Sequence, residues 1–129
     1  MIPLLPIDIE AELQAYLADK GYNCAAVPLP RNFDSNLPFV LIERVGGRAE
    51  TEISLSNQVA FDVYAETFKS ATETANALSY DISQLVGGVI GERAVYNVEI
   101  SALPYNNPDD RHPTTPRVTL SLLISLRGR

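Results

Sequence analysis

The residue types that could perform chemistry gather in one short segment near the C-terminal end of the chain. His112, the only histidine, follows Asp109, Asp110 and Arg111. A histidine beside carboxylates can form an acid–base pair or contribute to a metal site. A lone histidine lacks the further ligands of a zinc site, and a loop without a supporting framework positions catalytic groups poorly. We therefore favour a solvated loop, and a small hydrolase or isomerase that uses Asp109, Asp110 and His112 stays as an alternative.

Other candidates for catalysis or cofactor binding are weaker. Cys24 stands next to Ala25, Ala26 and Val27, an apolar setting that raises the pKa of a thiol and keeps it inert. As the only cysteine, it excludes an internal disulfide and a zinc site of several cysteines, which fits a reducing compartment. Neither a nucleophile elbow nor a glycine-rich phosphate loop occurs. The sequence predicts no enzyme and no cofactor.

Charged residues offer surfaces for contact with other subunits. The acidic pairs lack the regular oxygen-ligand spacing of a calcium loop, so we interpret them as solvated surface. Arginine is favoured over lysine at interfaces, and several arginines could pair across a subunit boundary or be scattered surface charge. The candidate subunit-interface residues are Arg44, Arg48, Glu50, Glu52, Asp109, Asp110, Arg111 and Arg127, with Arg117 as a further arginine of the same kind.

Composition indicates one globular domain, residues 1–129. The hydrophobic fraction is 46% and the charged fraction 20%, close to globular averages. The formal net charge of −6 opposes binding to phosphate backbones, so sequence-specific binding of nucleic acid is not expected. The N-terminus lacks the basic start and long apolar core of a secretory signal, and no apolar run is long enough to span a membrane. We expect a cytoplasmic protein.

Helical spacing marks two segments. In residues 8–20 the apolar side chains recur every three or four positions, acidic residues stand near the start, and Gly21 offers a stop. The second helix is predicted to begin after Ser70, because Ser70 to Glu73 matches a capping box. Gly87–Gly88 are expected to end this helix. Its apolar stripe consists of Ala71, Ala75, Leu78, Ile82, Leu85 and Val89.

Apolar runs and alternation predict strands at 22–28, 38–45, 58–66, 94–103 and 117–127. In 94–103, Tyr96, Val98, Ile100 and Ala102 alternate. Residues 48–57 are polar and weakly alternating, so a long loop and an extended hairpin both remain open. Residues 104–116 hold four prolines and are expected to form an exposed loop that becomes ordered on contact. The element order predicts an α+β fold in which a mixed, mainly antiparallel sheet packs against two helices.

The stretch V-A-F-D-V-Y-A-E-T-F-K-S-A-T-E-T-A-N-A-L, from Val59 to Leu78, resembles the signature of the tail terminator and tail completion proteins of long-tailed, siphovirus-like phages and prophages. In that family a strand of the form hydrophobic-x-hydrophobic-Asp-hydrophobic-Tyr/Trp-Ala runs into a helix after a short polar turn. The chain length, the N-terminal helix, the proline-rich loop before the second strand and the final strand closing at Arg-Gly are similar too. The resemblance covers most of the chain in layout.

The resemblance implies a structural virion protein. Family members form a homo-oligomeric ring, usually a homohexamer, that caps the tail tube, terminates its polymerisation and provides the head–tail joining surface. The implied partners are further copies of the chain, the tail tube protein and the head–tail connector protein. The implied location is the tail or neck of the virion, assembled in the cytoplasm of the host bacterium.

Two further alternatives stay open. The chain could be another head–tail connector or a tail tube component, because other neck and tail proteins share this layout. It could also be a small binding module with a pocket between the helices and the sheet. A ring protein needs open strand edges or long loops for its neighbours, and residues 46–57 and 104–116 supply two such segments.

Overall fold

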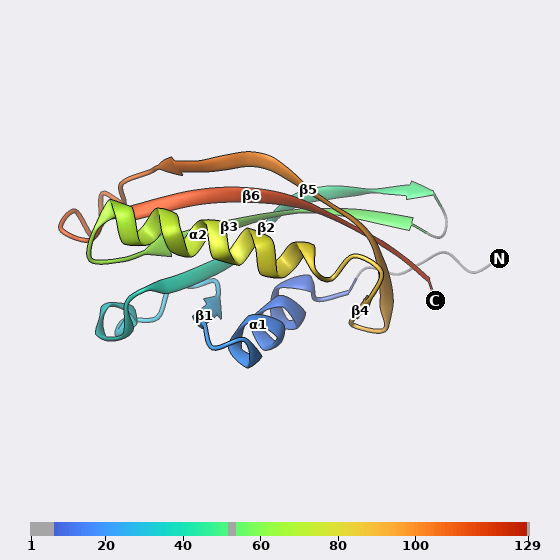
Figure 1. Cartoon of the computed structure of the whole chain (residues 1–129), viewed down its shortest axis with the longest axis horizontal. Coiled ribbons are helices and arrows are strands. Elements are labelled where there is room, and N and C mark those ends of the chain that lie inside the picture. The colour runs from blue at the N-terminus through green and yellow to red at the C-terminus, as the bar shows by residue number, and fades with distance from the viewer. Residues whose placement is uncertain (1–6, 52–53, 129) are drawn as a thin grey trace.

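The computed structural model describes residues 7–51 and 54–128, which form an α+β fold (Figure 1). The elements along the chain are α1 (Ile9–Asp19), β1 (Asn23–Ala26), the 3-10 helix η1 (Phe33–Asn36), β2 (Phe39–Thr51), β3 (Ser54–Tyr64), α2 (Phe68–Ser83), β4 (Val89–Ile90), β5 (Arg93–Asn106) and β6 (Arg117–Arg127).

All strands belong to one six-stranded sheet in the order β1-β2-β3-β6-β5-β4. β1 and β2 are parallel, and the other neighbouring pairs are antiparallel. The middle of the sheet consists of β3 and β6. β3 pairs with β6 along its full length, from Ser54 opposite Arg127 to Tyr64 opposite Arg117. The predicted mixed, mainly antiparallel sheet with two helices is therefore confirmed.

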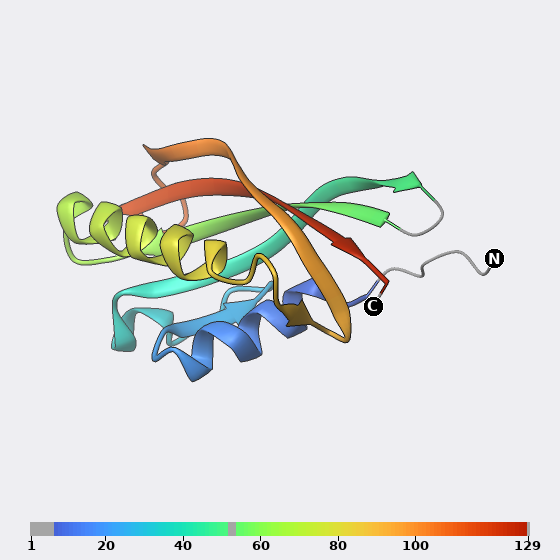
Figure 2. The ribbon, with the colours of Figure 1, turned by 45° about the vertical axis from the view of Figure 1, so that its right-hand side comes forward.

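Both helices lie on the same face of the sheet, as two views of the ribbon show (Figures 1 and 2). α1 contacts β1 and β2, whereas α2 contacts β3, β5 and β6. Alternate residues of the central strands point toward the helices and are fully buried, among them Phe61, Leu120 and Leu122. Full burial of such a side chain contributes about 1.5–3 kcal/mol, so this apolar layer is the main source of cohesion.

The first helix follows the sequence prediction closely. Asp8 is the N-cap, and its carboxylate accepts a hydrogen bond from the N–H of Ala11 at 3.1 Å. Ile9, Leu13 and Leu17 are buried against the sheet. A helix of 11 residues is marginal alone, so this stripe rather than intrinsic propensity holds it in place.

The second helix begins earlier than predicted. Its N-cap is Thr67, whose hydroxyl accepts a hydrogen bond from the N–H of Ser70 at 3.0 Å. The predicted cap at Ser70 is wrong, because β3 ends at Tyr64 and leaves room for only a short turn before the helix. The helix ends at Ser83, and Val89, predicted on its apolar stripe, belongs to β4 and is exposed.

Residues 48–51 and 54–57 pair as an extended hairpin, the second of the two alternatives. β2 runs to Thr51 and β3 starts at Ser54, so the hairpin reaches past the end of α2 (Figures 1 and 2). A β-bulge at Val45 separates this part of β2 from the part that packs on the helices. We call residues 45–51 and 54–58 the arm.

The predicted alternation of β5 is broken by β-bulges. The register with β6 shifts between Val95 and Asn97, between Ile100 and Ala102, and again between Ala102 and Tyr105. Each bulge adds a residue on one strand only, so the side chains after it change face. Val98 and Ile100 lie in one bulge-free stretch and share the face that the helices cover; Val98 packs against the core as expected, whereas Ile100 is half exposed.

The sheet face opposite the helices, here called the outer face, carries a second, smaller apolar cluster. Phe33 of η1 covers Phe39, Leu41 and Tyr64, and its ring centroid lies 4.7 Å from that of Tyr64. Phe39 and Leu41 alternate along β2 with the core residues Val40 and Ile42, which places the two clusters on opposite faces. The loop before β2 is thus packed on the sheet.

Candidate functional site

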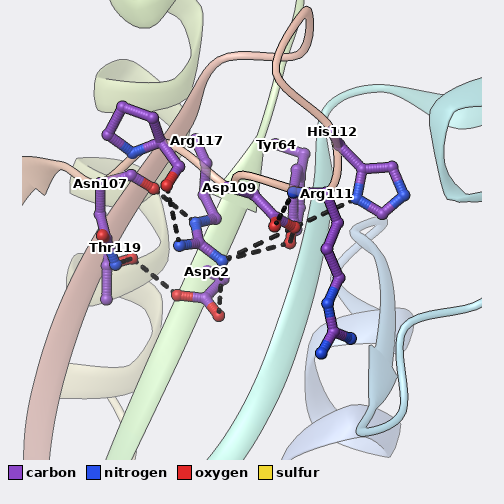
Figure 3. A network of polar contacts seen from close by, with 9 residues as sticks. Asp62, Tyr64, Asn107, Asp109, Arg111, His112, Arg117 and Thr119 are labelled. Atoms are coloured by element: carbon purple, nitrogen blue, oxygen red, sulfur yellow. Dashed lines mark hydrogen bonds and ion pairs between the residues drawn. The ribbon is translucent and has the colours of Figure 1, made fainter.

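The loop between β5 and β6 is fixed to the outer face by the carboxylate of Asp109 (Figure 3). This carboxylate accepts hydrogen bonds from the Tyr64 hydroxyl at 2.8 Å and from the Arg111 N–H at 3.0 Å. The Nδ1 atom of His112 lies 3.1 Å from Oδ2 of Asp109, the same oxygen that accepts the hydrogen bond from Tyr64. A sheet residue and two loop residues therefore converge on one acceptor.

Arg117, the first residue of β6, closes the network from the other side. Its Nε atom donates to the carbonyl of Asn107 at 2.5 Å, and its Nη2 atom donates to the carbonyl of Pro108 at 3.4 Å. Its Nη1 atom lies 3.8 Å from Asp109 and 3.9 Å from Asp62. A rigid guanidinium with five donors suits this role, because it bonds two loop carbonyls while neutralising two carboxylates.

The network continues along β3 and β6 to Asp62 and Thr119. Thr119 donates its hydroxyl proton to Asp62 at 2.6 Å and accepts a hydrogen bond from the Asn107 side chain at 3.0 Å. We call the whole set the Asp109 network; its members are Asp62, Tyr64, Asn107, Asp109, His112, Arg117 and Thr119.

The electrostatics of the network keep Asp109 ionised. Burial alone would raise the pKa of Asp109, but hydrogen bonds from His112, Tyr64 and the Arg111 amide, together with the charge of Arg117, lower it to about 2. Burial raises the pKa of Tyr64 to about 12, and the hydrogen bond that its phenol donates to Asp109 acts in the same direction. The phenol therefore remains a donor and the carboxylate an acceptor across the ordinary pH range.

His112 acts as part of the packing. Its ring meets Phe33 edge-on, with centroids 4.8 Å apart and planes at 80°. The structure brings His112 and Asp109 together but leaves Asp110 exposed, and both oxygens of Asp109 accept bonds that shape the loop. Residues 107–116 form a loop with exposed positions, as predicted, and the network and the aromatic cluster anchor this loop to the sheet. The predicted start of the loop at residue 104 is wrong, because residues 104–106 belong to β5.

The remaining sites expected from the sequence can be placed as well. Cys24 is half-buried with its Sγ atom 3.5 Å from the Gln14 carbonyl, and burial raises the pKa of its thiol, as predicted. Among residues 7–51 and 54–128, no group of three or more histidine, cysteine or acidic side chains is arranged to hold a metal ion. Within the same residues, no helix is both long and apolar enough to cross a membrane.

The candidate interface residues separate into two groups at opposite ends of the sheet. Arg44, Arg48 and Arg127 lie near the arm, since Arg48 is opposite Ser56 and Arg127 is opposite Ser54. The Arg127 guanidinium sits 4.7 Å over the Tyr96 ring. Asp109, Asp110 and Arg111 lie on the anchored loop at the other end. The Glu50 side chain and all of Glu52 lie outside the described part of the structure.

Between the arm and β5, the outer face is hollowed into an open concavity of about 610 Å³. Arg48 and Gln58 line it from the arm side, and Asn97 and Glu99 line it from β5. The Gln58 amide donates to the Ser101 hydroxyl, and the Asn97 amide donates to Glu99 at 2.8 Å. This shallow polar surface has no converging set of reactive groups among the described residues.

Both sides of the sheet end in strands that are much shorter than their neighbours. β1 pairs with β2 only from Phe39 to Ile42, and the Arg44 N–H is then satisfied by the Glu10 carboxylate at 3.0 Å. On the opposite side, β4 pairs only with Arg93 and Ala94 of β5. In the described chain, residues 45–49 of β2 and 97–106 of β5 therefore lack a neighbouring strand on one side; we call them the β2 edge and the β5 edge.

Apolar side chains are exposed at both edges. On the β5 edge, Ile100 is 50% exposed, Leu103 71% and Tyr105 49%. On the β2 edge, the bulge residue Val45 is 53% exposed. The sequence pattern pointed to the segments 46–57 and 104–116 for contacts but not to these side chains, because an apolar residue in a strand is ordinarily assigned to the core.

Comparison with known proteins gives a likeness of fold. No protein-family model and no protein of curated function matches the sequence. A chain of a solved structure, described as the virion of a native gene transfer agent (GTA) particle, has a similar fold with a TM-score of 0.60. The two chains are 14% identical, and the likeness covers 93% of this chain and 95% of that chain. Almost the whole arrangement of helices and strands is thus shared with a virion component.

Proposed function

We propose that this protein is a structural component of a phage-like virion, an oligomeric ring that caps the tail tube, terminates its polymerisation and provides the head–tail joining surface. The observation that carries the proposal is the likeness to a chain of a gene transfer agent virion over 93% of this chain. The resemblance of residues 59–78 to tail terminator proteins specifies the role within such a particle. The ring would assemble in the cytoplasm of the host bacterium and remain in the tail or neck.

The architecture is compatible with a protein that functions by binding other subunits. Its most reactive constellation, Asp109 with His112, is used to anchor a loop, and exposed apolar residues lie at strand edges. A net charge of −6 also suits a ring through which DNA passes, since like charge suppresses contacts with phosphates. The partners in this proposal are further copies of the chain, the tail tube protein and the head–tail connector protein.

The decisive experiment is tube elongation in vitro. Purified tail tube protein from the same particle would be polymerised with and without this protein, and tube lengths would be measured by negative-stain electron microscopy. We expect added protein to stop elongation and to appear as a ring at one tube end. Tubes that keep growing, with no density at their ends, would refute the terminator role.

A head–tail connector or a tube subunit remains the second candidate, because the virion likeness covers the fold without specifying a position in the particle. The same experiment separates these roles. A tube subunit would itself form tubes, and a connector would bind heads without stopping elongation.

A further inference from the structure

The β5 edge has the features of a contact surface rather than of a protected edge. Natural sheets guard open edges with charged residues, above all lysine, yet Glu99 is the only charged residue from Asn97 to Asn106. Ile100, Leu103 and Tyr105 instead expose apolar surface within six consecutive positions. Bulges and Pro104 limit regular strand pairing after Ile100, so the side chains must supply much of any contact there.

The β2 edge offers a matching surface. Val45 projects from the bulge, and Gly46 follows it without any internal need for glycine: a Cβ atom at Gly46 would meet nothing within 4 Å, and its φ lies outside the left-handed region. Glycine inside a strand costs about 0.5–1 kcal/mol relative to alanine, so its presence favours a close approach from outside the chain. Arg44 and Arg48 flank this spot, opposite in charge to Glu99.

We propose that the β5 edge of one copy docks on the β2 edge of a second copy, with Ile100, Leu103 and Tyr105 seated against Val45 and Gly46. The inference rests on the proposed function for the ring but specifies which surfaces form it. The occupant is a second copy because the two surfaces complement each other in apolar character and charge within one chain.

The contact joins two different surfaces, so it is heterologous. Each copy then keeps one free β2 edge and one free β5 edge, and successive copies add head to tail until the ring closes. Residues Asn97–Ile100 and Gly46–Ala49 are the bulge-free stretches of the two edges, so any backbone pairing between copies is expected there.

The test uses one variant for each edge. Leu103→Lys disables the β5 edge and Val45→Lys disables the β2 edge, and each should raise the dissociation constant between copies about 30-fold or more, as for a central interface residue. Tyr80→Lys is the matched control, because Tyr80 is 65% exposed and belongs to α2 rather than to either edge strand. Native mass spectrometry and light scattering over a concentration series provide the readout.

Mixing the two variants gives the sharpest outcome. Each variant alone should be monomeric, whereas an equimolar mixture retains one intact junction and should give heterodimers and nothing larger. Dimers formed by Val45→Lys alone, through two β5 edges, would overturn the heterologous contact. Assembly of both variants and the unaltered chain to the same extent would overturn the edge contact altogether.

Gly46→Val provides an independent check on folding. Open space at Gly46 predicts an unchanged or higher melting temperature but impaired assembly, so loss of the oligomer cannot be attributed to unfolding. If the unaltered chain stays monomeric at all concentrations, the edge contact is overturned. The tube elongation experiment then tests the proposed function independently of this contact. If the edge variants still stop tube elongation as rings, only the surfaces named here are wrong.

Discussion

On the face that the helices cover, buried apolar side chains from α1, α2 and the five strands β2 to β6 form a continuous layer. On the outer face, the Asp109 network and the cluster around Phe33 hold two loops by directional bonds between few groups. The first arrangement tolerates no charge but many small rearrangements, because burial is non-directional. The second depends on individual partners, so losing one leaves the others buried and unsatisfied. The face covered by the helices thus supplies most of the stability, whereas the outer face fixes the conformation of the loops.

The largest effect is expected from a charge in the apolar layer. Ile82→Asp would place a carboxylate at a fully buried position of α2, and burying an unpaired charge costs more than about 4 kcal/mol. We expect an unfolded or insoluble protein by circular dichroism and chemical denaturation. Tyr80→Asp, on the exposed side of the same helix, should fold normally; equal damage from both variants would contradict the assignment of the layer.

On the outer face, Asp109→Ala should destabilise the protein by about 2–3 kcal/mol without unfolding it, because Tyr64, His112 and Arg117 lose a shared partner. Hydrogen exchange of the 107–116 amides should rise while that of β3 stays protected. Asp110→Ala changes the adjacent exposed carboxylate and should alter stability by less than about 0.5 kcal/mol. A loop that exchanges no faster in Asp109→Ala would argue against the anchoring role.

Acid should weaken the outer face selectively. The pKa of Asp109 is lowered from 3.8 to about 2, so its contribution is complete above pH 4 and is lost as the pH falls toward about 2. The loss should be roughly 1–2 kcal/mol, allowing for screening by nearby solvent. Urea denaturation at several pH values, compared with Asp109→Asn, isolates this carboxylate. Identical pH profiles for the two proteins would remove Asp109 as the cause.

A smaller effect is expected at the start of α2, where the helix layer meets solvent. Thr67→Ala removes the hydroxyl that accepts the Ser70 N–H and should cost about 1 kcal/mol. Ser70→Ala should change the unfolding free energy by less than about 0.5 kcal/mol, since Ser70 contributes a backbone donor to the cap. Thermal denaturation of the two variants distinguishes the caps; a larger loss at Ser70 would support the capping box read from the sequence.

The helix face could be predicted well from the sequence because its information is local. Period-two alternation in β3 and β6 and three-to-four spacing in α1 identify the buried residues directly. The cap was misplaced because Ser70 and Glu73 fit a capping box, whereas Thr67 has no acidic residue three positions later. A local pattern cannot tell which hydroxyl the end of β3 places at the turn.

The outer face and the edges were largely missed because their contacts join distant residues. Tyr64 and Asp109 are 45 positions apart, and Asp62 and Thr119 are 57 apart. Asp62, the one charged residue of β3, was the one signal that a polar partner must cover that face. The bulges of β5, which take Ala102 off the face shared by Val98 and Ile100, leave no recognisable trace in composition.

Gly46 and Gly47, adjacent in the arm, should respond differently to substitution. A Cβ atom at Gly47 would lie 2.1 Å from the Ser56 carbonyl oxygen, and its φ of +132° is strained for other residues, so every substitution there should lower the amount of folded protein. At Gly46 a side chain finds open space. A library of substitutions selected once for abundance in cells and once for assembly of the proposed oligomer should therefore agree at position 47 and diverge at position 46.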